Sequence, residues 1–517
     1  MAECLAKTLS FGVSGVNGFP VHVEVFSAGG LPMMEIIGLP DTSVKESKNR
    51  VSAAIMNSCS GFSASARITV NLAPADIRKE GPSFDLPIAL GVMIATDNLH
   101  PHPEFDPERV AFFGELGLDG SVQPVRGVLP MVISARENGI AEVILPEKNA
   151  REASCIPGIR IFPVSSLRQA MEWIETRNGI TEQEQVPFDT LKQESASGTD
   201  MALIKGQKGA RRAVEVAAAG GHNMLMIGVP GSGKTMLARC IPGILPPMSF
   251  EEALETTRIH SICGKLPAGS GLMVTRPFCA PHHNASVASL IGGGQNAGPG
   301  EVSLAHNGVL FLDELPEFSR GALEALRQPL EDGVVSVARV KRQAQYQSSF
   351  MLVAAMNPCP CGYFGSSRRT CRCTPPEIRR YLDRVSGPLL DRIDLQIEVD
   401  SVPLQEINDA ETGESSAAVA MRVSRARSIQ LERYSGTGKH CNAQLNTADV
   451  RRYCNPDGEA LRLLNTAVDS LHLSMRAYQR ILKVARTIAD LAGETTISSS
   501  HIAEAVQYRE LDQKYWR

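Results

Sequence analysis

Residues 228–235 (GVPGSGKT) constrain the fold of this chain more than any other segment, because they fit the pattern GxxxxGK[ST] at every fixed position. The apolar residues 223–227 predict a short strand before them, and residues 236–239 predict the start of a helix after them. Between a strand and a helix, the glycines let the backbone curve so that its N–H groups point at phosphate oxygens. A glycine-rich turn that matched the pattern by chance would not be expected to lie between a strand and a helix. The sequence therefore predicts a nucleotide-binding P-loop.

The P-loop predicts a role for each of its residues. Lys234 is expected to reach the β- and γ-phosphates, and Thr235 is expected to hold Mg²⁺ through its hydroxyl. The residues expected to contact ATP are consecutive: Gly228, Val229, Pro230, Gly231, Ser232, Gly233, Lys234, Thr235 and Met236.

A second motif is the apolar run 308–312 (GVLFL), which ends in Asp313 and Glu314. Such a run predicts a buried parallel strand with two carboxylates at its carboxyl end. We expect Asp313 to hold Mg²⁺ and Glu314 to polarise the attacking water as a general base. By itself the pattern also fits an ordinary strand followed by an acidic turn, but the P-loop favours an ATP hydrolase.

Length, composition and net charge limit the number of domains, the cellular location and the kinds of partner that we expect for this chain. A chain of 517 residues is too long for one core, so roughly two to four domains are expected. No apolar run approaches the about 20 residues of a membrane span, and residues 1–7 lack a signal-peptide pattern, so a cytoplasmic location without membrane contact is expected. The net charge of −4 gives no overall basic footprint, which leaves nucleic-acid binding to local loops.

Four regions separate by pattern. Residues 1–180 mix strands and helices, and the polar residues 181–200 are interpreted as a linker. Residues 201–402 alternate strands with helices, which predicts a parallel α/β sheet, and residues 403–517 are nearly all helical, with 501–509 as the last helix. The most periodic segments are strands at 21–26, 67–72, 142–146, 350–355 and 395–399 and helices at 86–95, 208–219 and 478–491.

Three later polar residues are candidates for completing an ATP site. Asn357 follows a predicted strand and is placed to lie between the γ-phosphate and the attacking water; the alternative is a turn started by Asn-Pro. Arg392 precedes a strand and is a candidate for stabilising the transition state in a neighbouring subunit. Arg384 competes for that role, and a surface ion pair is the alternative. Arg476 opens a helix, from which it either contacts the nucleotide or forms a plain salt bridge.

Together with five further stretches, these features resemble the magnesium-chelatase-like AAA+ ATPases, and more closely the bacterial YifB/ComM group. The stretches are 276–283 (RPFCAPHH), 299–306 (PGEVSLAH), 326–332 (LRQPLED), 357–362 (NPCPCG) and 485–491 (ARTIADL). The resemblance covers essentially the whole chain. It implies an AAA+ core with a C-terminal helical lid and ATP sites at the interfaces of a hexameric ring. It also implies that Asn357 is sensor 1, Arg392 the arginine finger and Arg476 sensor 2.

The same resemblance implies a branch-migration helicase that acts on single-stranded and branched DNA in natural transformation and homologous recombination, with recombination proteins as candidate partners. It further implies a hairpin that faces the ring pore and corresponds to residues 333–342. Alternating valines and a basic tip suit a β-hairpin, in which Arg339, Lys341 and Arg342 are expected to contact DNA phosphates. The alternative is a solvated basic edge that discourages strand pairing.

Four of the twelve cysteines are clustered as Cys359, Cys361, Cys371 and Cys373, whereas the other eight are scattered and are expected to be reduced thiols. Four thiolates bind Zn²⁺ tetrahedrally and close a loop that lacks a core of its own, so a structural zinc is favoured. The C-x-C spacing is tighter than the usual C-x₂₋₄-C, and a disulfide or reactive thiols remain alternatives.

Three histidines also lie near the ATP motifs in the sequence: His282, His283 and His306. A further metal site is one interpretation of this group. Hydrogen bonding or an interface role is the more common use of histidines beside an ATP site, and it is the one we expect.

In the N-terminal region, residues 79–87 (KEGPSFDLP) resemble the nucleophile segment of Lon-type proteases, and residues 114–120 and 124–131 extend the likeness. The resemblance implies a Lon-protease-like α+β domain. A Ser–Lys dyad needs a lysine in the last of these stretches to activate the serine, and none is present. Ser83 is therefore expected to be structural, and the domain is interpreted as a scaffold or a DNA-handling unit.

The predicted fold class is thus α/β, with an AAA+ P-loop core, a helical lid and a Lon-like N-terminal domain. The favoured function is an ATP-driven DNA motor. An AAA+ ring that remodels a protein or inserts a metal, as magnesium chelatase does, is the alternative, and an ATP-dependent protease is disfavoured by the missing lysine.

Overall fold

A computed structural model describes residues 4–59, 66–193, 198–266, 271–293, 298–339, 342–366, 369–400 and 413–516. By its internal contacts the chain divides into two compact units: Met1–Glu194 with Phe250–Met273, and Ser195–Ser249 with Val274–Arg517. The segment Phe250–Met273 thus follows the P-loop in the sequence but packs within the first unit. The boundaries expected at residues 180, 200 and 402 remain predictions.

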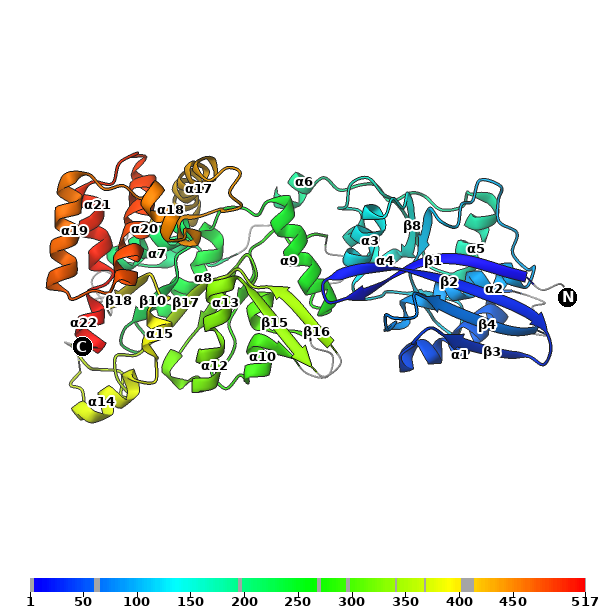
Figure 1. The fold of residues 1–517 in the computed structure, drawn as a ribbon, viewed down its shortest axis with the longest axis horizontal. Coiled ribbons are helices and arrows are strands. Elements are labelled where there is room, and N and C mark those ends of the chain that lie inside the picture. The colour runs from blue at the N-terminus through cyan, green and yellow to red at the C-terminus, as the bar shows by residue number, and fades with distance from the viewer. Residues whose placement is uncertain are drawn as a thin grey trace. The chain divides into compact units, whose positions relative to one another are not determined.

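The first unit is built on a seven-stranded mixed sheet with the strand order β3-β4-β2-β1-β5-β8-β9 (Figure 1). β2 pairs antiparallel with both β1 and β4, and the other neighbours pair in parallel. The strands are β1 (Cys4–Ser14), β2 (Asn17–Gly29), β3 (Met33–Ile37), β4 (Ala66–Ala73), β5 (Val110–Phe112), β8 (Glu142–Pro146) and β9 (Arg160–Val164), with a separate pair β6 (Glu115–Leu116) and β7 (Val122–Gln123).

The first unit also contains helices. They are α1 (Thr42–Ser58), the 3₁₀ turn η1 (Pro82–Phe84), α2 (Asp85–Ala95), α3 (Val128–Glu137), α4 (Glu147–Ala153), α5 (Leu167–Thr176), α6 (Phe188–Gln193) and α9 (Phe250–Ile262). In β2, Val21, Val23 and Val25 are buried and alternate with more exposed residues, which confirms the strand predicted from that alternation. The strands predicted at 67–72 and 142–146 and the helix predicted at 86–95 are also confirmed.

The polar stretch 181–200, which we interpreted as a linker, contains the short helix α6. The ring of Phe188 packs edge-on against Phe250, with 5.5 Å between the ring centroids, and Leu191 is buried. Two apolar side chains are too few to produce a visible period, so the helix depends on tertiary contacts that the sequence pattern does not carry.

The second unit contains a five-stranded parallel sheet with the order β11-β14-β17-β10-β18. The strands are β10 (Met224–Ile227), β11 (Phe278–Cys279), β14 (Val309–Leu312), β17 (Met351–Met356) and β18 (Leu395–Glu398). Every residue of β10, β14 and β17 is buried, as expected for a parallel sheet covered on both faces. The predicted parallel α/β core is therefore confirmed. Because adjacent parallel strands end at one edge, the residues that follow these three strands are brought together.

The second unit also contains helices, 3₁₀ turns and two pairs of short strands. The helices and 3₁₀ turns are η2 (Met201–Leu203), α7 (Lys208–Gly220), α8 (Lys234–Ile244), α10 (Val287–Ile291), α11 (Glu301–Leu304), η3 (Leu315–Glu317), α12 (Arg320–Ala325), α13 (Arg327–Asp332), α14 (Pro375–Leu382) and α15 (Gly387–Leu390). The remaining strands form the pair β12 (Gly292–Gly293) and β13 (Gly298–Pro299) and the hairpin of β15 (Val334–Arg339) and β16 (Arg342–Gln347).

The C-terminal region is helical, as predicted (orange and red in Figure 1), and two of its helices pack against α7. They are α17 (Ser416–Arg433), η4 (Asn442–Gln444), α18 (Thr447–Tyr453), α19 (Gly458–Ser470), α20 (Met475–Ala492), α21 (Ser499–Gln507) and α22 (Leu511–Trp516). The prediction that residues 501–509 form the last helix is wrong, because α22 follows and buries Leu511 and Tyr515. Among the helices of the described part of the chain, none is long and apolar enough to cross a membrane.

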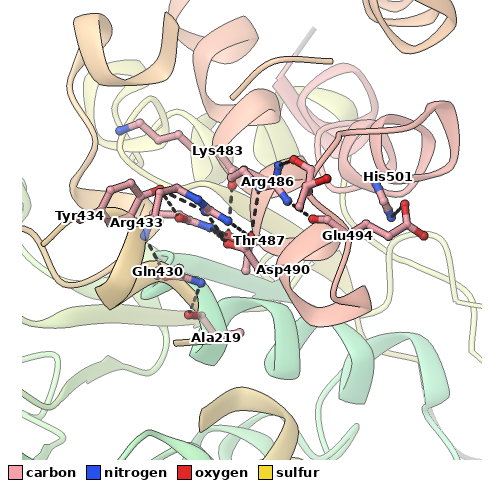
Figure 2. Close-up of polar contacts among 12 residues, drawn as sticks. Ala219, Gln430, Arg433, Tyr434, Lys483, Arg486, Thr487, Asp490, Glu494 and His501 are labelled. Atoms are coloured by element: carbon pink, nitrogen blue, oxygen red, sulfur yellow. Dashed lines mark hydrogen bonds and ion pairs between the residues drawn. The ribbon is translucent and has the colours of Figure 1, made fainter. Parts of the chain in front are cut away.

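A buried polar network ties these C-terminal helices to the core of the second unit (Figure 2). Asp490 on α20 accepts hydrogen bonds from Arg433 on α17 and from Arg486 on its own helix. Gln430 on α17 donates to the carbonyl of Ala219 near the end of α7, over 3.2 Å. The network therefore joins the helical region to the helix that precedes β10.

A second buried contact, centred on His222, also joins the C-terminal helices to the core of the second unit. His222 lies between Asp394 and Thr487 of α20, with its ring nitrogens 3.2 Å from the carboxylate and 2.7 Å from the hydroxyl. Burial alone would raise the pKa of Asp394, but the charge of Arg480 and the hydrogen bond with His222 lower it below its ordinary value. An ionised carboxylate thus links the segment before β18 to α20.

Candidate functional site

The P-loop has the strand–loop–helix geometry that its sequence predicts. It connects the end of β10 to the start of α8 at Lys234. Gly231 and Gly233 adopt φ values of 77° and 91°, a left-handed conformation that favours glycine. At Gly228, a Cβ atom would lie 2.2 Å from the carbonyl oxygen of Val399, just after β18. These glycines are therefore required by backbone conformation and by close packing.

Lys234 is buried, and its side chain lies inside the P-loop. Its Nζ donates to the carbonyl oxygens of Gly228 and Val229 over 2.7 and 3.0 Å, and it lies 3.3 Å from Oδ1 of Asn357. Burial lowers the pKa of Lys234, an effect that the carboxylate of Asp313 partly opposes. The amine is thus held beside the residue predicted as sensor 1.

Thr235 and Asp313 meet across the sheet edge, as the magnesium prediction requires. The Thr235 hydroxyl donates to Oδ2 of Asp313 over 2.9 Å. Two adjacent ligands of an octahedral Mg²⁺, each about 2.0–2.1 Å from the ion, lie about 2.9 Å apart. The two oxygens therefore fit a pair of adjacent magnesium ligands.

Glu314, the predicted general base, follows Asp313 but points to a different partner. Its carboxylate lies 3.0 Å from Nδ1 of His283, and its backbone has a φ of 52°. The His283 ring packs on that of His282, with centroids 4.1 Å apart. From the sequence, we expected His283 to form hydrogen bonds or an interface near the ATP site, but the residue that it contacts could not be named. Only the adjacency of β11 and β14 identifies Glu314 as that partner.

A further contact to the P-loop was missed in the sequence. The side-chain amide of Gln207, which precedes α7, donates to the carbonyl oxygens of Ser232 and Asp400 over 2.5 and 3.0 Å. No motif marks this residue. Its φ of 49° is a conformation that the sequence does not predict for glutamine.

The four clustered cysteines gather as predicted. The six pairs of Sγ atoms all lie within 4.8 Å, and the separations among Cys359, Cys361 and Cys371 are 3.4, 3.6 and 3.7 Å. A disulfide S–S bond is about 2.0 Å long, whereas two thiolates of a tetrahedral zinc site with Zn–S of about 2.3 Å lie about 3.8 Å apart. All four thiols are free of disulfides. The geometry therefore fits a four-thiolate metal site and contradicts the disulfide alternative.

Hydrogen bonds within this loop also suit thiolates. The backbone N–H of Phe364 donates to Sγ of Cys359 over 3.3 Å. The backbone N–H of Arg372 is the main cause that lowers the pKa of Cys361 to about 6, whereas burial raises the pKa of Cys373 to about 12. Among the described residues, the four cysteines are the only group of three or more His, Cys, Asp and Glu side chains whose ligand atoms lie close enough together to share one metal ion.

The three predicted arginines contact carboxylates within the chain. Arg392 is buried; its guanidinium lies 2.6 Å from Glu331 and donates to the carbonyl of Pro388 over 2.6 Å. Arg384 pairs with Glu317 at 2.9 Å. Arg476 is 68% exposed and lies 3.4 Å from Asp391, the neighbour of Arg392. The structure thus brings Lys234, Thr235, Asp313 and Asn357 together, whereas the roles of Arg392 and Arg476 remain predictions.

The remaining predicted residues lie in the hairpin and in the first unit. β15 and β16 form a hairpin, but its second strand extends to Gln347, beyond the predicted range 333–342. Arg339 and Arg342 form its last pair. Lys341 and the side chains of Arg339 and Arg342 lie outside the described residues. Ser83 is buried in η1, and the nearby Lys79 donates to the carbonyl of Pro74. This placement agrees with a structural role for Ser83.

Comparisons with known proteins extend across the chain. Profiles described as "Magnesium chelatase, subunit ChlI", "Subunit ChlI of Mg-chelatase" and "Magnesium chelatase, subunit ChlI C-terminal" match residues 200–407, 23–149 and 413–509. The competence protein ComM of Haemophilus influenzae is 44% identical over 98% of this chain and 97% of its own length. An uncharacterised protein YifB of Escherichia coli is 42% identical over 96% of both chains.

A likeness to Lon proteases is weaker but present. Lon protease 2 of Bacillus subtilis is 32% identical over 102 residues, which are 20% of this chain and 18% of that protein. Together with the parallel sheet, the P-loop geometry and the helical C-terminal region, these similarities show that the chain belongs to the YifB/ComM family of magnesium-chelatase-like AAA+ ATPases.

Proposed function

We propose that this protein is an ATP-dependent DNA motor of the cytoplasm, a hexameric ring that migrates DNA branches and promotes the integration of incoming DNA in natural transformation and homologous recombination. The observation that carries the proposal is the convergence of Lys234, Asn357, Thr235 and Asp313 at the carboxyl edge of the parallel sheet. The resemblance to a protein named for competence supports the DNA role.

The residues at the sheet edge supply the parts that ATP hydrolysis needs. Lys234 would exchange its bonds to the loop carbonyls for bonds to the β- and γ-phosphates. Thr235 and Asp313 would hold Mg²⁺, which neutralises charge that develops on the phosphates. Asn357 would orient the attacking water. Glu314 would accept its proton after leaving His283.

The ring is proposed to complete this site across a subunit interface. Arg392 would act on the neighbouring subunit's γ-phosphate, for which it must leave its ion pair with Glu331. Arg476, which is already exposed, would contact the nucleotide from the helical lid. Under this proposal hydrolysis depends on assembly. Single-stranded and branched DNA would pass through the pore beside Arg339, Lys341 and Arg342, where phosphate contacts are independent of sequence.

The cysteine cluster is proposed to hold a structural Zn²⁺ through Cys359, Cys361, Cys371 and Cys373. Four protein ligands leave no open coordination position, so the ion would supply folding energy rather than catalysis.

The test measures ATP hydrolysis by the purified full-length protein alone, with single-stranded DNA and with a branched duplex, and follows movement of a labelled branch. We expect DNA to stimulate hydrolysis and the branch to move only when ATP is present. Lys234→Ala is the matched control and should do neither. Robust hydrolysis with neither stimulation nor branch movement would contradict the DNA motor and favour the alternative suggested by the chelatase profiles, remodelling of a protein or metal-insertion partner.

A further inference from the structure

We propose that the cysteine loop, defined as residues 359–366 and 369–373, braces the ATP site, so that the metal bound by its thiols sets the position of the P-loop and of Asn357 and thereby the affinity for nucleotide. This inference rests on the proposed ATP and zinc sites, and it gives the cluster a role beyond stabilising its own loop. Two separate contacts carry it.

The first contact runs along the chain from the cluster to the predicted sensor. Asn357 follows β17 and precedes Cys359 by only two residues. Cys359 is fully buried, and its Sγ both accepts the N–H of Phe364 and lies 3.4 Å from Sγ of Cys361. The Oδ1 of Asn357 lies 3.3 Å from Nζ of Lys234. A shift of Cys359 would therefore move the amide that lies beside the P-loop lysine.

The second contact is steric and reaches the P-loop directly. Gly362 adopts a φ of +83°, and its N–H donates to the carbonyl of Cys359 over 2.9 Å. A Cβ atom at Gly362 would lie 2.7 Å from both Cδ and Cγ of Pro230, the third residue of the P-loop. The turn that carries Cys361 thus lies directly against the proline ring. On its other side, Phe364 packs edge-on with Tyr515 of α22, with ring centroids 6.4 Å apart.

A metal would determine whether this brace is rigid. The Sγ atoms of Cys359, Cys361 and Cys371 lie 3.4–3.7 Å apart. A metal bound between them as thiolates would hold together groups whose like charges otherwise repel. Metal coordination fixes such a loop, and its removal releases the loop. Loss of the ion would withdraw the turn from Pro230 and free Cys359, so the P-loop amides would lose the arrangement that cradles phosphate.

The loop contains a matched pair of glycines for the test. Gly362 and Gly365 have φ values of +83° and +78°, so alanine strains the backbone similarly at both positions. A Cβ at Gly365 meets nothing within 4 Å, whereas one at Gly362 meets Pro230. The comparison of Gly362→Ala with Gly365→Ala therefore isolates the contact to the P-loop.

We would measure the dissociation constant of a fluorescent ATP analogue and the zinc content of each purified protein. We expect Gly362→Ala to bind the analogue at least about tenfold more weakly than wild type and Gly365→Ala to bind within about twofold, which corresponds to about 1.4 and 0.4 kcal/mol. In the double variant Pro230→Ala/Gly362→Ala, removal of the ring should restore affinity, a coupling between residues in contact.

Metal removal gives the second measurement. Cys373→Ser should lose zinc and bind the analogue about tenfold more weakly, with unchanged far-UV circular dichroism. Unchanged affinity in Gly362→Ala, or in a folded zinc-free Cys373→Ser protein, would overturn the brace. If Cys373→Ser fails to fold, Gly362→Ala with its control still decides the question. Wild-type protein that fails to bind the analogue would instead contradict the proposed function itself.

Discussion

Asp490→Asn should strongly destabilise the second unit. The Asp490 carboxylate is fully buried and accepts from both terminal nitrogens of Arg433, over 3.0 and 2.5 Å. It also accepts from Nδ2 of Asn442 over 2.9 Å and from Nε of Arg486 over 3.1 Å (Figure 2). Asparagine keeps the shape of the side chain but leaves the guanidinium of Arg486, only 2% exposed, without its counter-charge.

Removing one partner of a buried ion pair costs about 3–5 kcal/mol, because the other charge stays buried without compensation. Whole domains are stable by only about 5–15 kcal/mol. We therefore expect Asp490→Asn to remove a large share of the stability of this unit and to lower the midpoint of its unfolding in urea.

Urea unfolding followed by fluorescence can isolate the unit. The chain has two tryptophans, of which Trp173 lies in the first unit and Trp516 in the second. With Trp173→Phe present in every protein compared, fluorescence reports on Trp516 alone. The slope of the unfolding free energy against urea concentration should be the same in the variants compared. A shift of the unfolding midpoint then measures a change in stability.

The matched control is Asp391→Asn, which removes an exposed ion pair at the start of the same helix. Arg476 and Asp391 are 68% and 39% exposed and lie 3.4 Å apart, a pair expected to contribute about 0–1 kcal/mol. A cost below about 1 kcal/mol for Asp490→Asn, or equal costs for the two variants, would refute the conclusion that the buried network anchors α20.

The other predictions concern the ATP site and the first unit. Lys234→Ala should weaken binding of a fluorescent ATP analogue by about 10- to 100-fold, since a charged hydrogen-bond donor to phosphate is lost, and unchanged binding would contradict its role. Glu314→Gln should bind ATP but hydrolyse it about 10²- to 10⁴-fold more slowly, so that ATP stays bound; normal turnover in a rapid-quench assay would show that Glu314 is not the base. Ser83→Ala should leave ATP hydrolysis unchanged, and neither it nor wild type should degrade an unfolded protein substrate; serine-dependent degradation would reverse the structural assignment.

Much of the site was predictable because its chemistry is local. The P-loop needs glycine where its backbone is left-handed, and Gly231 and Gly233 occupy two such positions. The run before Asp313 and the strand before Asn357 were recognisable as buried strands by their apolar residues alone. Once parallel pairing is inferred, their carboxyl ends must lie at one edge. The meeting of Thr235 with Asp313 follows directly.

Contacts between distant segments were not predictable in this way. The pairing of Glu314 with His283 depends on β11 lying beside β14, and that of Arg392 with Glu331 joins residues 61 positions apart in the sequence. Membership of Phe250–Met273 in the first unit was equally hidden, because its apolar residues have the same period whichever core they enter.

Residue identity and spacing alone therefore determined the nucleotide loop, the most periodic strands and helices and the four-thiol cluster, since each is specified by side chains close together in the chain. The tertiary structure alone decided which partner each functional side chain meets: Lys234 with Asn357, Glu314 with His283, and Gly362 with Pro230. The reason is physical. Local sequence sets backbone conformation and burial pattern, whereas the register and neighbours of packed elements depend on the sum of many long-range contacts that no single segment contains.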